Sequence, residues 1–181
     1  MEYWDLYDMQ RQPLGQVHQR SAALPEGTYH IVISVWTVNT KGEILLTLRS
    51  PYKDIYPNCW ENTTGSVVAG ESSKEGALRE LREETGIQAT EDELYFVDTL
   101  IKSNSLVDRY LVKKDVKISD LVLQKEETVA ARWVPFAEFL ILLQNKEIAF
   151  PVERDLQRVK IGLQTFLSKT SLDKDYVNIR S

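Results

Sequence analysis

Residues 65–87 read GSVVAGESSKEGALRELREETGI, and this stretch has the pattern of a tight loop followed by a helix. Ser72 and Glu75 have the spacing of a capping box, which predicts that an α-helix begins here. Gly86 is a suitable end for that helix, because glycine adopts the left-handed C-cap conformation at little cost. Gly65 and Gly70 suit a loop that turns tightly before the helix.

Three glutamates of the predicted helix, Glu80, Glu83 and Glu84, stand at positions i, i+3 and i+4. At about 100° per residue, their carboxylates project within an arc of roughly 100° on one helix face. Like charges at this spacing repel one another, so a bound cation would stabilise the cluster. Mg²⁺ prefers such carboxylate oxygens and often binds substrate phosphates as well. The alternative is an ordinary solvated acidic face.

Other side chains of the helix have complementary roles. Arg79 stands four residues before Glu83, so its guanidinium can pair with that carboxylate and orient a metal ligand. Leu78 and Leu81 lie on the opposite face, where we expect them to anchor the helix in the core. The helix is therefore predicted to present carboxylates on one side and apolar side chains on the other.

The composition excludes several classes of function and of structural site. The chain has 181 residues, 43% hydrophobic and 27% charged, which suits one hydrophobic core. Its formal charge of −5 argues against binding nucleic acid or an acidic membrane through basic surface charge. Cys59 is the single cysteine, which excludes an intrachain disulfide and a Cys-based zinc site. With no secretory signal or membrane-spanning stretch in the sequence, we expect a cytoplasmic protein.

Strand and helix patterns continue on both sides of the central stretch. Residues 29–38 are rich in β-branched and aromatic side chains and, with residues 43–49, predict a β-hairpin. We also expect a short strand at 59–62, paired strands at 93–102 and 106–113, a strand at 129–134, and helices at 135–143 and 152–167. The expected fold class is α/β, with an α/β/α sandwich around a mixed β-sheet.

The two ends of the chain differ from its middle. Residues 1–28 alternate loosely between apolar and polar side chains and predict an N-terminal arm or hairpin that covers one edge of the domain. Residues 29–170 are expected to form the domain itself, and residues 171–181 a C-terminal tail. The sequence leaves a homodimer open.

Residues 65–87 resemble a complete Nudix box, the motif of the Nudix hydrolase superfamily. Every defining position is filled, by Gly65, Glu71, Arg79, Glu80, Leu81, Glu83, Glu84, Gly86 and Ile87. At average residue frequencies a chance match in a chain of this length is on the order of 10⁻⁷ or rarer. The flanking strands and the RWVP segment at 132–135 also resemble the family. The likeness implies a Nudix-like α/β/α sandwich.

The resemblance also implies an activity. Nudix enzymes use Mg²⁺ or Mn²⁺ to cleave the diphosphate linkage of nucleoside diphosphate derivatives and similar small phosphorylated metabolites. Arg79 and Glu71 would hold the helix and the preceding loop in place. The implied metal ligands are Glu80, Glu83, Glu84 and the backbone carbonyl of Thr64.

Hydrolysis requires a general base that deprotonates the attacking water. The position of this group varies within the family. Glu127, just before the predicted strand at 129–134, resembles the loop glutamate that many members use, followed as candidates by Glu126 and Glu80. The alternative for Glu126 and Glu127 is a solvated loop. The catalytic residues that we expect are Glu127, Glu80, Arg79 and Glu71.

Two other functions are compatible with the likeness. The arm and the WEN segment at 60–62 also resemble the isopentenyl diphosphate isomerase branch of the superfamily. Aligned on that segment, the catalytic cysteine of the isomerase would fall at Gly65 and its metal-binding histidine at Val67, so both are missing. A non-catalytic nucleotide-sensing module is the second alternative, although its box carboxylates would commonly be lost. No complete substrate-subgroup signature lies outside the box.

Overall fold

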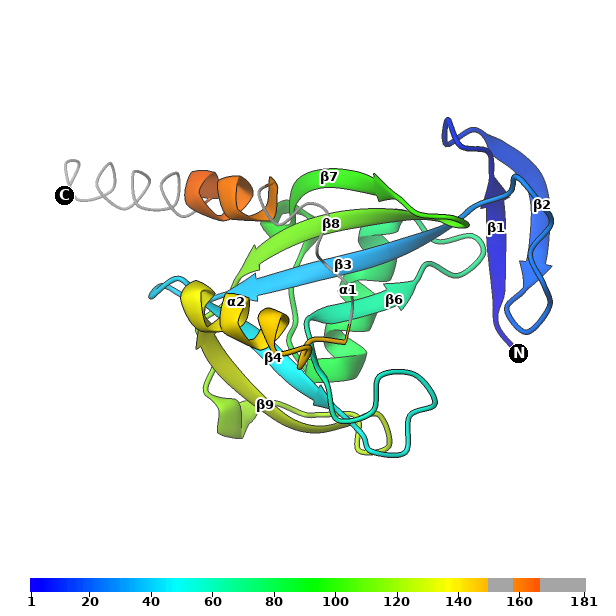
Figure 1. The fold of residues 1–181 in the computed structure, drawn as a ribbon. Helices are drawn as coiled ribbons and strands as arrows, with labels where there is room; N and C mark the ends of the chain where they lie inside the picture. Colours follow the sequence, from blue (N-terminus) through cyan, green and yellow to red (C-terminus); the bar gives the residue numbers. More distant parts are fainter. Residues whose placement is uncertain (150–157, 167–181) are drawn as a thin grey trace, which may run out of the picture.

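The computed structural model describes residues 1–149 and 158–166 (Figure 1). The strands are β1 (Tyr3–Tyr7), β2 (Pro13–Gln19), β3 (His30–Val38), β4 (Glu43–Arg49), β5 (Trp60–Glu61), β6 (Thr63–Ser66), β7 (Tyr95–Ile101), β8 (Ser105–Lys113) and β9 (Thr128–Pro135). The helices are α1 (Ser73–Thr85), α2 (Phe136–Gln144) and the short η1 (Glu91–Glu93) and η2 (Ile118–Asp120). Residues 158–166 are also helical, within the helix predicted at 152–167. The remainder of that predicted helix and the predicted tail at 171–181 lie outside the described residues.

The central sheet is mixed, as predicted. β3 pairs in parallel with β8 along its whole length and antiparallel with β6. β7 and β8 form the expected antiparallel pair around the turn at 103–105. On the other side, β4 pairs antiparallel with β5 and β9.

The predicted hairpin of β3 and β4 is confirmed at its turn but not along its length. The side chain of Asn39 closes the turn, accepting hydrogen bonds from the backbone N–H groups of Lys41 (2.9 Å) and Glu43 (3.0 Å). The strands are paired only at Val38 and Ile44. Farther from the turn, at Val32–Val35, β6 takes the place of β4 as the antiparallel neighbour of β3, and α1 packs against β3 and β6.

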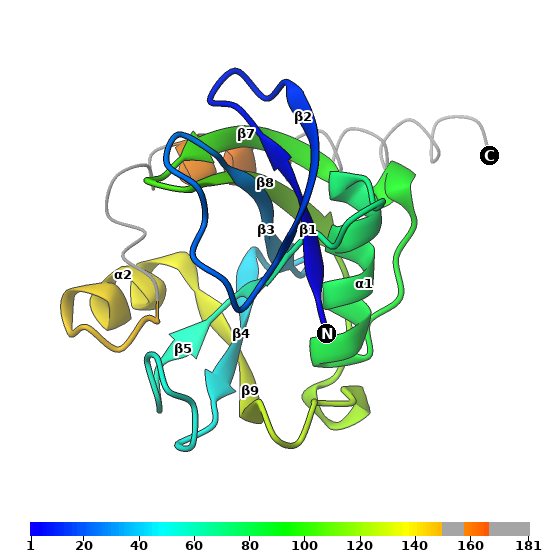
Figure 2. The ribbon, with the colours of Figure 1, turned by 90° about the vertical axis from the view of Figure 1, so that its right-hand side faces the viewer.

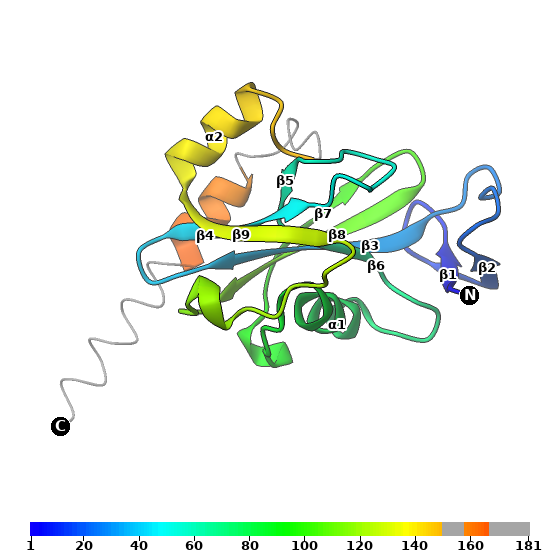
Figure 3. The same ribbon diagram turned by 90° about the horizontal axis from the view of Figure 1, so that it is seen from below.

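Helices cover both faces of the sheet, which confirms the α/β/α sandwich (Figure 3). On one face, Ala77 and Leu81 of α1 are fully buried against Ile33 and Val35 of β3. The opposite face has a second core, which joins α2 and the 158–166 helix to the sheet. Within the described part of the chain, no helix is long and apolar enough to span a membrane.

β1 and β2 form a separate antiparallel hairpin at the end of the molecule where β3 begins (Figures 1 and 2). The side chains of Trp4 and Leu6 in β1 are buried. The backbones of Tyr7 and Tyr29 exchange two hydrogen bonds of 2.8 Å, which tie the end of β1 to the chain just before β3. The hairpin is therefore docked against the domain.

Candidate functional site

Both ends of α1 have the predicted caps. The Ser72 hydroxyl accepts a hydrogen bond from the backbone N–H of Glu75 (3.2 Å), and the Glu75 carboxylate accepts one from the backbone N–H of Ser72 (2.7 Å). Gly86 has φ of 75° and donates its N–H to the carbonyl of Arg82 (2.9 Å). These local interactions fix where the helix begins and ends, and so which side chains face the sheet.

The three glutamates predicted as metal ligands differ sharply in exposure. Glu84 is 8% exposed, the side chain of Glu80 is 17% exposed, and that of Glu83 is 46% exposed. The carboxylate face of α1 therefore runs from the protein interior to solvent. A cation bound across it would be partly enclosed by protein, where electrostatic attraction is stronger than in water.

Gly65 makes room for Glu80. It lies in β6, where a Cβ atom would come within 2.1 Å of the Glu80 Cδ. The predicted tight turn at this residue is wrong, because Gly65 is paired strand backbone opposite Ile33. Its lack of a side chain instead allows the Glu80 side chain to pack closely against the backbone of β6. Gly70, at φ of 87°, does turn as predicted. Thr64 immediately precedes Gly65 in β6.

Arg79 organises the box through its guanidinium. Its Nε and Nη2 donate to the two carboxylate oxygens of Glu71, at 2.8 and 3.1 Å, and Nη2 also donates to the carbonyl of Ser66 (2.9 Å). Its Nη1 donates to Glu80 (2.8 Å) and to Glu83 (3.2 Å). The bond to Glu83 confirms the predicted i, i+4 pair. The hydrogen bond to Glu71 raises the pKa of Arg79.

Glu84 is the most unusual carboxylate of the site. Its Oε2 is buried and has no hydrogen-bond partner among the described residues. Burial raises the pKa of Glu84 well above its ordinary value, and the negative charges of Glu61 and Glu80 raise it further. Burial also raises the pKa of Glu80, although Arg79 opposes this shift. A cation would relieve both the burial cost and the mutual repulsion.

Glu61 was not predicted as a site residue. It lies in β5, buried, and the Nη1 of Arg49 donates to both of its carboxylate oxygens, at 2.9 and 2.8 Å. Burial raises the pKa of Glu61 despite this pair. Strand alternation offered a signal, because Glu61, Thr63 and Gly65 are two residues apart and share one face. Since the glutamate precedes the box, the motif itself did not point to it.

Glu127, the predicted general base, lies in the loop before β9. Its negative charge contributes to raising the pKa of both Glu84 and Glu61, so it lies near both carboxylates. Its carboxylate pairs with the Nζ of Lys53 at 3.0 Å. The backbone N–H of Ser50 donates to the Glu127 carbonyl (2.7 Å), joining the 50–59 loop to this one. Glu126 is exposed.

The donor set fits a divalent cation, but the side chains are not arranged around one. Within residues 1–149 and 158–166, no three acidic, histidine or cysteine side chains are grouped to hold a metal ion. Arg79 accounts for this, because it draws Glu80 and Glu83 toward its guanidinium. The unpartnered Oε2 of Glu84 and the Glu80 carboxylate, which packs against Gly65, are features that a cation between them would use.

Comparisons with known proteins agree on one family. The family model of the NUDIX domain matches residues 28–156. An uncharacterized Nudix hydrolase of Listeria monocytogenes is 36% identical over 148 residues, which cover 81% of this chain and 88% of that protein. An isopentenyl-diphosphate Delta-isomerase of Shigella flexneri is 27% identical over 147 residues, covering 77% of this chain and 80% of that enzyme.

The solved structures agree on the fold. The crystal structure of a protein from Deinococcus radiodurans superposes with a TM-score of 0.73 at 21% sequence identity, covering 87% of this chain and 98% of that one. At this identity the likeness concerns the fold alone. The family match, in contrast, spans most of the chain and includes β6 and α1 with the complete box. The chain therefore belongs to the Nudix hydrolase family.

Proposed function

We propose that this protein is a Mg²⁺- or Mn²⁺-dependent hydrolase that cleaves the diphosphate linkage of a nucleoside diphosphate derivative or a similar small phosphorylated metabolite. The observation that carries the proposal is the buried carboxylate of Glu84, whose Oε2 has no hydrogen-bond partner among the described residues and whose pKa the charge of Glu80 helps to raise, within an intact box. Burying two carboxylates together is costly unless a cation binds there. The net charge of −5 supports a compact substrate rather than a nucleic acid.

The cation would be held by Glu80, Glu83 and Glu84, with the Thr64 backbone carbonyl as a further donor. A bound Mg²⁺ or Mn²⁺ would lower the pKa of a bound water and neutralise charge on the phosphate oxygens. Glu71 and Arg79 would orient Glu80, because Arg79 bonds to both carboxylates. Since Arg79 also bonds to the Ser66 carbonyl, it holds α1, the preceding loop and β6 in one arrangement.

Glu127 would act as the general base that takes the proton from the attacking water. It lies on a different loop from the box, is close enough for its charge to act on Glu84 and Glu61, and remains 43% exposed. Lys53 holds the carboxylate at the edge of the site, and a phosphate group entering the site would compete for the same ammonium group.

The substitution Glu127→Gln is expected to lower kcat about 10²–10⁴-fold, which is the usual contribution of a general base. The Mg²⁺ concentration for half-maximal activity should change little, since Glu127 is not among the proposed ligands. Steady-state kinetics across a Mg²⁺ titration measure both quantities. Glu126→Gln is the matched control, because it removes the neighbouring carboxylate. An unchanged kcat in Glu127→Gln would exclude this residue as the base.

Gly65→Ala is expected to impair activity while leaving the protein folded. The added methyl group would displace the flexible end of Glu80, whose Cδ lies 2.1 Å from the position of a Cβ. We expect kcat to fall about tenfold or more, because small misplacements of reacting groups have large effects, with the circular dichroism spectrum unchanged. Wild-type kcat in Gly65→Ala would contradict the placement of Glu80.

An activity assay with a panel of nucleoside diphosphate derivatives and prenyl diphosphates identifies the substrate class. Each compound is tested with Mg²⁺, with Mn²⁺ and with chelator. Release of a nucleoside monophosphate or of phosphate, dependent on metal, supports the hydrolase and names its substrate class. Isomerisation of isopentenyl diphosphate without phosphate release would instead favour the isomerase. Binding without turnover across the panel would favour a nucleotide sensor.

A further inference from the structure

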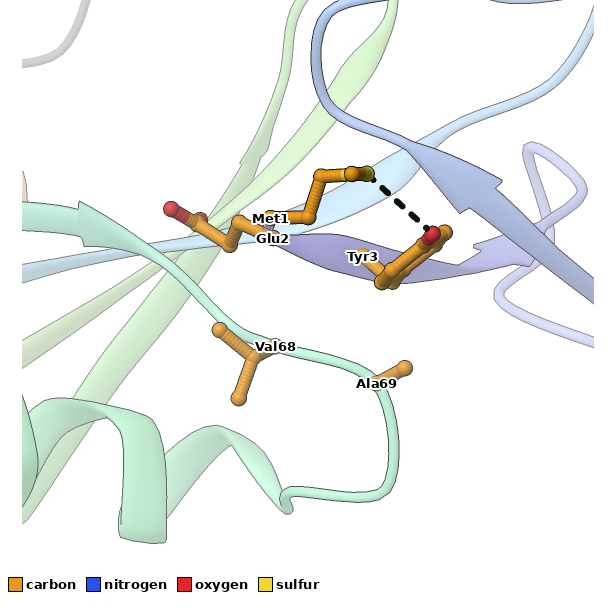
Figure 4. A pocket seen from close by; sticks show the side chains of 5 residues that line it. All are labelled: Met1, Glu2, Tyr3, Val68 and Ala69. Atoms are coloured by element: carbon orange, nitrogen blue, oxygen red, sulfur yellow. Dashed lines mark hydrogen bonds between the residues drawn. The ribbon is translucent and has the colours of Figure 1, made fainter.

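The N-terminal hairpin contacts the loop that carries part of the box. This hairpin belongs to the arm at residues 1–28, and we call residues 67–72, between β6 and α1, the box loop. The backbone N–H of Ala69 donates to the carbonyl of Tyr3 (2.8 Å), and the N–H of Gly70 donates to the Asp5 carboxylate (2.8 Å). Met1, Glu2 and Tyr3 of the arm and Val68 and Ala69 of the box loop line an open pocket of about 430 Å³. Figure 4 shows these side chains and the two segments that carry them.

The arm is firmly anchored elsewhere. The guanidinium of Arg11 makes two hydrogen bonds of 2.6 Å to Asp108, which is 1% exposed in β8. Asp108 also accepts a hydrogen bond from Ser73, the first residue of α1. Arg11 adopts φ of 64°, a conformation that a non-glycine residue keeps only when its surroundings favour it. Trp4 stacks on His30, with ring centroids 3.9 Å apart.

A continuous set of contacts leads from the arm to the carboxylates of α1. The Asp5 carboxylate accepts a hydrogen bond from the N–H of Gly70, and the next residue along the chain is Glu71. Glu71 accepts two hydrogen bonds from Arg79, which donates in turn to Glu80. The position of the box loop therefore sets where the Glu71 carboxylate lies, and through Arg79 it influences Glu80.

We propose that the arm is a working part of the site and that Asp5 is a positioning residue for the Nudix box. By holding the box loop, Asp5 would keep Glu71 and Arg79 where they align Glu80 for cation binding and turnover. This inference rests on the proposed function, because it assigns a role to the same carboxylates. If the arm only covered the end of the sheet, loss of the Asp5 carboxylate would leave the box unaffected.

The test compares Asp5→Ala with Asp8→Ala in the full-length protein. Asp8 is a matched control, because it lies in the same arm and carries the same charge, but its carboxylate accepts from Gln12 within the arm. Asp5→Asn keeps an oxygen that can accept from Gly70 and should retain most of the wild-type behaviour. Circular dichroism establishes that each variant is folded.

Three measured properties are expected to change together in Asp5→Ala: hydrogen exchange, Mn²⁺ affinity and kcat. Amide hydrogen exchange of the metal-free protein should become about tenfold faster at residues 67–72, because a hydrogen bond to a charged acceptor is lost. The dissociation constant for Mn²⁺, measured by calorimetry, should rise several-fold. With substrate, kcat should fall about tenfold with little change in KM, as expected when alignment rather than substrate binding is affected.

The outcomes separate this inference from the proposed function. Unchanged exchange in Asp5→Ala, or faster exchange in that variant with wild-type Mn²⁺ affinity and kcat, would overturn the role of Asp5. Equal effects in Asp8→Ala would overturn it as well, since they would reflect charge or arm stability in general. If the wild-type protein cleaved no diphosphate, the proposed function would fail, while hydrogen exchange and Mn²⁺ affinity would still decide whether Asp5 positions the box.

Discussion

Glu84→Gln is expected to lower kcat by about 10²–10³-fold or more while it stabilises the metal-free protein. The loss of activity follows from removing the charge of a proposed metal ligand at nearly constant shape. The gain in stability follows from burial, because Oε2 of Glu84 has no hydrogen-bond partner among the described residues. A neutral amide is less costly to bury there than a carboxylate. Activity and stability should therefore change in opposite directions.

The effect of Glu84→Gln on the stability of the metal-free protein should depend on pH. Burial raises the folded-state pKa of Glu84 above the unfolded value of ~4.3. The group's contribution to stability is therefore complete below the unfolded pKa and is lost as pH rises through the folded pKa. Glutamine does not titrate, so the variant should gain most at neutral pH, on the order of 1 kcal/mol. Urea unfolding in chelator at pH 5 and at pH 7 measures this difference.

Glu83→Gln provides the matched control. Its side chain is 46% exposed, so the same change should remove activity without the gain in stability. A Glu84→Gln protein that kept wild-type kcat would contradict the metal assignment. A variant that was inactive but no more stable than wild type at pH 7 would contradict the burial argument while leaving that assignment in place.

Arg79→Lys is the second substitution with a large expected effect, and we expect kcat to fall roughly 10–100-fold. Lysine keeps the charge, but its compact ammonium group cannot reproduce the planar set of donors that reaches Glu71, Glu80 and the Ser66 carbonyl together. The Mg²⁺ concentration for half-maximal activity should rise, because Glu80 loses its orientation. Steady-state kinetics with a Mg²⁺ titration measure both changes.

Arg82→Lys is the control for Arg79→Lys. Arg82 is exposed on the same helix, one turn nearer its C-terminus, and should tolerate the change with wild-type kinetics. Equal activity in the two variants would show that the positive charge of Arg79 suffices and that the shape of its guanidinium does not matter. The proposed positioning of Glu80 through Glu71 and Arg79 would then be wrong.

Local interactions in α1 were predictable because they depend on residues a few positions apart. The capping box at Ser72, the glycine cap at Gly86 and the Arg79–Glu83 pair are all of this kind. Runs of apolar, β-branched and aromatic residues likewise identified the strands, because a strand covered on both faces buries side chains on both. The fold class and the placement of the box on α1 could therefore be predicted from residues that are close together in the sequence.

Partners distant in sequence were not predictable from such patterns. β3 pairs mainly with β8 rather than with the adjacent β4, since apolar alternation marks a strand but does not specify its neighbour. The Asp5–Gly70 and Arg11–Asp108 contacts join residues 65 and 97 positions apart. The role of Gly65 was misjudged for the same reason, because its constraint comes from Glu80 across the interface of β6 and α1.

Titration of the wild-type protein with Mn²⁺ would determine whether cleavage of a diphosphate depends on bound metal. Electron paramagnetic resonance would follow bound Mn²⁺, and the hydrolysis rate of a diphosphate found in the substrate panel would be measured at the same concentrations. Our account predicts that the rate rises in step with metal occupancy and returns to background when chelator is added. Full hydrolysis without bound metal, or full occupancy with no cleavage of any diphosphate offered, would contradict it.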